Sequence, residues 1–231
     1  MSSIKELFGI NFNYLYETIA VTLAKLEKEK KIIPNSACMG VKFLDNNTFQ
    51  MTPYLETDTY KNLIKSPYVS INFVDNIYFY ALAALLGENS GHTEREFPDS
   101  YYDSKDEIPY LKESWGVIFG ELDEHKIITK ATHLGENNVL QANFKFFDFI
   151  KRRESFHLKN RAENLALESI ILTTRLRIAI KKENREMYEK IYDRILYYRE
   201  QIDQFSKNKN ALKTMNFIME YIDKNINILK K

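Results

Sequence analysis

Hydrophobic and polar residues alternate along several short segments in the first half of the chain. In residues 17–24, Ile19, Val21 and Leu23 fall on one side of an extended chain, with small and polar residues between them. This period of two residues is typical of a strand with one buried face. The same period recurs further along, and we predict strands at residues 17–24, 36–44, 48–53, 68–74 and 115–122.

Turn and helix signals separate these strands. Asp45-Asn46-Asn47 is a tight-turn sequence, so residues 36–53 are predicted to form a β-hairpin. Apolar residues in 57–66 follow a helical period, and Thr57-Asp58 suits a helix start. A second helix is predicted at 76–86, ended by Gly87.

The strand signals stop near Asn138, and long helical patterns follow. Helices are predicted at 160–182, 186–205 and 210–229, with a further one at 138–154. Strands first and helices afterwards suggest two structural units. We place the boundary so that residues 1–135 form the first domain and residues 136–231 the second.

Residues 88–112 are polar and acidic, with several tyrosines. A connection of this length inside a compact domain is uncommon without a role. We expect it to lie over or beside a ligand pocket and to become ordered when ligand binds. The alternative is a disordered surface excursion.

The charge of the chain is uneven, although its formal net charge is only +1. Residues 151–231 hold 19 Lys and Arg against 11 Asp and Glu, whereas the preceding residues have a net charge of −7. A basic half could bind RNA or an acidic partner. Solvated helix faces explain the same charges, so nucleic acid is the less favoured partner.

Cys38 is the single cysteine, which excludes an intramolecular disulfide and a cysteine-based zinc site. No apolar run approaches the length of a membrane span, and the first residues lack the apolar stretch of a secretory signal. We therefore expect a cytoplasmic protein that does not enter a membrane.

The common nucleotide-binding and hydrolase motifs are missing from the sequence. Its four histidines lack the spacing of metal ligands. We therefore favour the absence of a metal site over a site built on His133 and Glu136.

Small residues on one strand and hydroxyls at one helix start are the candidate chemistry. Asn35, Ser36, Ala37, Cys38, Met39 and Gly40 would let a flat ring approach the backbone of a strand. Thr57 and Thr59, at a helix start with unpaired N–H groups, could hold a phosphate. The negative charge of the Asp58 carboxylate would repel a phosphate at this helix start unless the side chain turns away from it. An ordinary capped helix explains the same residues.

These segments resemble the flavin reductase-like split-barrel superfamily. Its members typically read Asn-x-Ala-Pro-x-Ser, then Asp-Thr-x-x-Asn-Ile, then a strand with Asn. The closer resemblance is to a mostly archaeal family known as domain of unknown function 447. The matching residues are Tyr16-Glu17-Thr18, Ala37-Cys38-Met39-Gly40-Val41, Pro53-Tyr54, Thr57-Asp58-Thr59-Tyr60-Lys61-Asn62-Leu63, Asn72-Phe73-Val74-Asp75 and the helix from Asn160-Arg161-Ala162-Glu163 to Thr174-Arg175-Leu176.

The resemblance implies a mixed α and β protein, an FMN-binding split β-barrel followed by a helical bundle, that forms a homodimer with FMN near the interface. Residues 37–40 would line the isoalloxazine ring. Thr57 and Thr59 would bind the phosphate with Tyr60 nearby, and Asn72 would bond near the ring or ribityl chain. Cys38 replaces the usual proline, so this strand can donate one extra N–H.

The resemblance supplies a cofactor but no substrate. We expect a flavin-dependent oxidoreductase or flavin reductase whose redox partner the sequence does not name. A flavin-binding module without turnover, and an RNA- or protein-binding factor that uses the basic half, are the alternatives.

Overall fold

The structure is a computed structural model that describes residues 3–26, 31–86, 96–132, 135–154, 161–205 and 208–229. Its elements, in chain order, are α1 (Ile4–Phe8), β1 (Leu15–Leu26), β2 (Lys31–Phe43), β3 (Thr48–Met51), α2 (Asp58–Lys65), β4 (Tyr68–Phe73), α3 (Ile77–Leu85), η1 (Asp99–Tyr101), β5 (Tyr102–Lys105), β6 (Ile108–Leu111), β7 (Gly116–Thr132), β8 (Gly135–Lys151), α4 (Arg161–Lys181), α5 (Arg185–Phe205) and α6 (Lys209–Leu229). The chain divides into two compact units, Met1–Asp75 with Gly87–Ser155 and Asn76–Leu86 with Phe156–Lys231.

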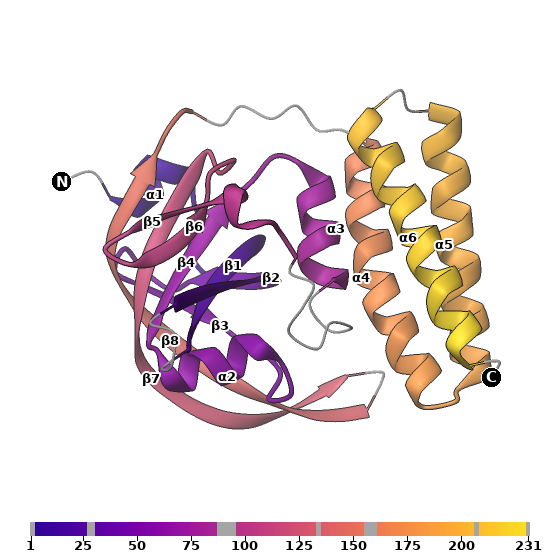
Figure 1. Ribbon diagram of the computed structural model, residues 1–231, viewed down its shortest axis with the longest axis horizontal. Coiled ribbons are helices and arrows are strands. Elements are labelled where there is room, and N and C mark those ends of the chain that lie inside the picture. The colour runs from indigo at the N-terminus through magenta and orange to yellow at the C-terminus, as the bar shows by residue number, and fades with distance from the viewer. Residues whose placement is uncertain are drawn as a thin grey trace. The chain divides into compact units, whose positions relative to one another are not determined.

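Six antiparallel strands of the first unit close into a barrel in the order β1-β2-β3-β8-β7-β4 (Figure 1). The strands predicted at 17–24, 36–44, 48–53, 68–74 and 115–122 correspond to β1, β2, β3, β4 and the start of β7. The predicted hairpin is also confirmed, because β2 and β3 pair across Asp45-Asn46-Asn47. The first unit is therefore the expected split barrel.

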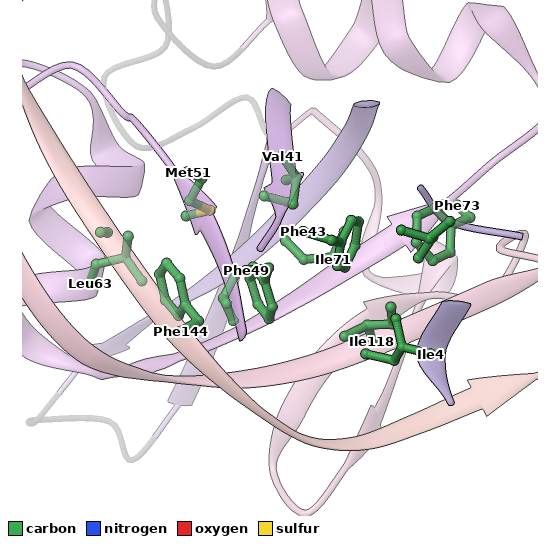
Figure 2. Close-up of a cluster of buried hydrophobic side chains, with 14 of the residues drawn as sticks. Ile4, Val41, Phe43, Phe49, Met51, Leu63, Ile71, Phe73, Ile118 and Phe144 are labelled. Atoms are coloured by element: carbon green, nitrogen blue, oxygen red, sulfur yellow. The ribbon is translucent and has the colours of Figure 1, made fainter. Parts of the chain in front are cut away.

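The barrel is filled by inward-facing aromatic and aliphatic side chains (Figure 2). Phe49 and Phe144 stack face to face, with ring centroids 5.0 Å apart and planes 7° apart. Gly120 lies against this pair, and a Cβ atom there would come within 2.4 Å of Phe49 Cζ. The absence of a side chain at this position therefore lets the two rings stack.

The strand β8 corrects the helix that we predicted at 138–154. Leu140, Ala142 and Phe144 are buried at a period of two residues, with half-buried or exposed polar residues between them. A register shift opposite Phe119 and Gly120 interrupts that period and leaves Phe147 47% exposed. The boundary predicted between residues 135 and 136 therefore falls inside β8, a strand of the barrel, after its first residue.

The segment 88–112 is largely folded where the structure describes it, from Glu96 onward. Strands β5 and β6 form a hairpin, and Ser70 Oγ donates to the Pro109 carbonyl oxygen at 2.7 Å. Phe97, Ile108 and Leu111 are buried. Ordering of this segment on ligand binding stays a prediction, and residues 88–95 lie outside the described residues.

The second unit consists of helices α3, α4, α5 and α6. The three long helices and α3 confirm the helices predicted at 160–182, 186–205, 210–229 and 76–86. The sequence of α3, IYFYALAAL, is apolar almost all round, and the helix packs against both α4 and α6. This explains why α3 belongs to the helical unit although its neighbours in sequence belong to the barrel. Among the described helices, none is both long and apolar enough to cross a membrane.

We expect the substitution Gly120→Ala to destabilise the protein by about 1–3 kcal/mol, because the new Cβ would press on a buried ring that cannot move aside. Gly40→Ala is the matched control. Its Cβ would lie 3.1 Å from Leu15 Cδ1, and Leu15 is 65% exposed and can shift. Urea unfolding measures both, and equal midpoints for the two variants would contradict the prediction.

Candidate functional site

The predicted ring-binding residues, Asn35 to Gly40, lie along an edge of β2 that the barrel leaves open. β1 pairs with β2 along its whole length. On the other side, β3 has four residues and pairs with β2 only at Val41–Phe43. No described strand therefore pairs with this edge of β2 before Val41.

The backbone groups of even-numbered residues in β2 point to this open edge. Alternate residues of an antiparallel strand direct both their N–H and C=O to the same neighbour. Leu44 N–H donates to Thr48 C=O at 3.0 Å, on the side away from β1, and Ser36 N–H donates to Glu96 Oε2 at 3.4 Å. The N–H and C=O groups of Cys38 and Gly40 point to this same side, and no described residue forms a hydrogen bond with them. The edge there presents, in order, a donor, an acceptor and a donor.

The side chains of β2 itself leave this edge accessible. Met39 points inward and packs against the barrel core, and Ala37 and Met39 are both half-buried. Gly40 has no side chain, and Cys38 points to the outer face. A flat ring could therefore reach the backbone without displacing a bulky group.

The Cys38 thiol is chemically quiet in this setting. Burial, together with the neighbouring carboxylate of Glu17, raises the pKa of Cys38 from the ordinary value of 9.0 to about 12. Cys38 Sγ donates to Glu17 Oε2 at 3.9 Å. The thiol is therefore protonated at neutral pH and is a poor nucleophile.

The helix start predicted to bind phosphate is an ordinary capped helix start, whose first turn leaves backbone N–H groups without a partner in the helix. Thr57 Oγ1 accepts from Tyr60 N–H at 3.3 Å and donates to Tyr54 C=O at 2.7 Å. The side chain of Asp58 turns to Lys61, 2.9 Å away, and both are exposed. The N–H groups of Asp58 and Thr59, at the first turn of α2, receive no hydrogen bond partner from the described residues. These two groups remain for an anion.

A polar cluster joins the two predicted halves of the site. Asn35 Nδ2 donates to Thr22 Oγ1 and to Thr59 Oγ1, each at 3.4 Å. Asn62 Nδ2 donates to the same Thr22 Oγ1 at 3.2 Å. The structure therefore brings β2 and α2 together as expected, but the Thr59 hydroxyl, which was predicted to bind the phosphate, accepts from Asn35. Tyr60 is half-buried and packs against the barrel core.

Asn72 has a different role from the one that the resemblance implied. Its side chain is fully buried. Asn72 Nδ2 donates to Ile19 C=O at 3.1 Å, and Asn72 Oδ1 accepts from Leu111 N–H at 2.8 Å and Ser114 Oγ at 3.1 Å. These bonds tie β4 to β1 and to β6, so the amide has no group left to offer a flavin ring.

Sequence reasoning missed two residues beside the open edge. Glu96 is 6% exposed, and its carboxylate accepts from the Ser36 N–H. The Tyr102 hydroxyl lies 2.7 Å from Ser36 Oγ. Both residues fall in the polar segment 88–112, where no period or motif separates a buried carboxylate from an exposed one. His133 of the alternative metal site lies outside the described residues.

The raised pKa of Cys38 predicts slow alkylation of the folded protein. At pH 8 the thiolate fraction should be roughly three orders of magnitude lower in the folded than in the unfolded chain. Iodoacetamide labelling with and without urea measures the two rates. We expect Glu17→Gln to speed labelling of the folded protein, whereas folded and unfolded rates within tenfold would contradict the raised pKa.

Comparison with known proteins identifies relatives of this chain. The family model described as protein of unknown function (DUF447), N-terminal domain, matches residues 16–148. The uncharacterized protein MJ1453 of Methanocaldococcus jannaschii is 28% identical over 142 residues, which is 62% of this chain and 67% of the relative.

A solved structure shares the fold of this chain. FMN-bound protein MM1853 of Methanosarcina mazei, assigned to DUF447, aligns over 93% of this chain and 97% of its own, with a TM-score of 0.71 and 18% identity. Flavoredoxin of Desulfovibrio vulgaris aligns over 62% of this chain and 73% of its own, with a TM-score of 0.43 and 15% identity. Since the family model covers more than half of the chain, the protein belongs to the DUF447 family.

Proposed function

We propose that this protein binds FMN, with the pyrimidine edge of the flavin on the open edge of β2. The observation that carries this proposal is the order of free backbone groups: Cys38 N–H, Cys38 C=O and Gly40 N–H. A flavin presents a carbonyl, an N–H and a second carbonyl along one edge of its pyrimidine ring. The two patterns are complementary, so three hydrogen bonds can form.

The start of α2 suits the phosphate of the same cofactor. Two free N–H groups, of Asp58 and Thr59, coincide with the positive end of the helix dipole. The charge of the Asp58 carboxylate is offset by Lys61. The hydrogen bond between Asn35 and Thr59 shows that this helix start adjoins β2. A single phosphate site, with no dinucleotide motif in the sequence, favours FMN over FAD.

The relatives support the cofactor. MM1853, which shares the fold over nearly its whole length, is an FMN-bound protein. The edge of β2 and the start of α2 supply independent support, because they come from the residues of this chain and not from the likeness.

We extend the proposal to a flavin-dependent oxidoreductase or flavin reductase. A bound flavin itself takes up and returns electrons. The protein's part is to hold the ring and to keep competing nucleophiles away from it, and the protonated thiol of Cys38 fits the second task. Oxidation of NADH or NADPH by the FMN-loaded protein would separate a catalyst from a carrier without turnover.

We also propose a cytoplasmic homodimer with FMN near the interface. β4 pairs with β7 only as far as Glu121, and no described strand covers the outer edge of β7 from Asp123 to Thr132. Ile127 on this part of β7 is 58% exposed. Exposed strand edges are commonly covered by another chain, which supports a second copy as the partner.

Native mass spectrometry of the purified protein tests cofactor and assembly together. We expect two chains of 27.3 kDa with two FMN molecules. A single chain that retains FMN would remove the dimer but keep the cofactor. FAD, or no flavin after incubation with FMN, would remove the proposed function.

The backbone pattern on β2 is tested by removing one donor. Cys38→Pro removes the N–H of residue 38, whereas Cys38→Ala retains it, and proline is the usual residue here in the superfamily that the chain resembles. Loss of one hydrogen bond should weaken FMN binding about 2- to 10-fold in the proline variant alone. Flavin fluorescence quenching gives both dissociation constants. Equal values for the two variants would show that the Cys38 N–H does not contact the cofactor.

A further inference from the structure

The open edge of β2 contains two stretches on which the flavin edge could dock. The first is the set already described, from Cys38 N–H to Gly40 N–H. The second, two residues earlier, would run from Ser36 N–H through Ser36 C=O to Cys38 N–H. The two positions differ by about 7 Å along the strand.

No third position exists in the described part of this edge. Pro34 has no N–H to donate. At the other end, Lys42 is opposite Gln50 of β3, so its backbone groups are used within the barrel. The choice of ligand position on β2 therefore depends on the Ser36 N–H.

The Ser36 N–H already has a hydrogen-bond acceptor, the carboxylate of Glu96. Its Oε2 accepts from Ser36 N–H at 3.4 Å, in the place where a neighbouring strand would otherwise lie. A carboxylate there blocks the second position twice over. It takes the donor, and it sets negative oxygens against the carbonyl that the flavin would bring.

Glu96 is held in this place by its surroundings. It is 6% exposed, and the next residue, Phe97, is fully buried. The ring of Phe97 packs against Tyr102, with centroids 6.2 Å apart, and the Tyr102 hydroxyl lies 2.7 Å from Ser36 Oγ. Both the carboxylate and its partner Ser36 are thus fixed by the same aromatic group.

We propose that Glu96 is a positioning residue that confines the flavin to a single register on β2, by closing the position at Ser36. This rests on the proposed function, because it presupposes a flavin edge on this strand.

The imino proton of the flavin N3–H reports the register in NMR spectra of the protein loaded with ¹⁵N-labelled FMN. We expect one imino signal for the wild type and two for Glu96→Ala. Adding Ser36→Pro removes the donor of the second position, so the double variant should return to one signal. Proline is acceptable there because the Ser36 N–H points away from β1. Glu113→Ala, at an exposed glutamate, is the matched control and should give one signal.

Glu96→Gln separates positioning from a merely structural role. Its amide oxygen still accepts from Ser36, so we expect one imino signal. If Glu96→Ala does not fold, Glu96→Ser, whose side chain is also too short to reach the Ser36 N–H, takes its place with the same expectation of two signals. A single signal in the truncated variant, or two signals in Glu96→Gln, would overturn the inference. Failure of the wild type to bind FMN would instead overturn the proposed function.

Discussion

The short pairing between β2 and β3 is the constraint on which the rest of the site depends. In a closed barrel each strand normally pairs with a neighbour on both sides, so its backbone N–H and C=O groups are hydrogen-bonded. Here β3 ends at Met51, while β2 runs far beyond its partner residue Val41. The unpaired stretch must be satisfied by water, by side chains or by a ligand. Glu96 satisfies one N–H, and two further donors remain on the same edge.

The outer face of the barrel shows why this edge stays open. The β5–β6 hairpin could in principle add to the sheet, but it lies across the outer faces of β1 and β4 instead. Asn72 holds it there through Leu111 N–H, and Ser70 holds it through the Pro109 carbonyl oxygen. The buried Asn72 amide thus acts on the open edge of β2 indirectly, because it holds the hairpin in a position where neither of its strands pairs with β2.

Local patterns made the first half of the fold predictable. The period of two in β1, the turn after β2 and the Thr57 cap all depend on neighbours in sequence. β8 was missed because its bulge opposite Gly120 breaks the period that marks a strand. The place of α3 was missed because its apolar sequence is equally suited to either unit. Within the site, Asn35 and Thr59 were predicted together and lie together. Glu96 was not predictable, because its burial is created by Phe97 and by a strand 60 residues away.

The replacement of proline by cysteine at position 38 shows how one substitution changes two properties of a site. The backbone gains an N–H on the open edge, which completes the donor, acceptor and donor order. The side chain gains a thiol, and a thiolate at this position would be a nucleophile. Burial and the carboxylate of Glu17 raise the pKa of Cys38 to about 12, so the thiol remains protonated. The environment of the outer face thereby allows the new backbone donor without the reactivity that a cysteine otherwise brings.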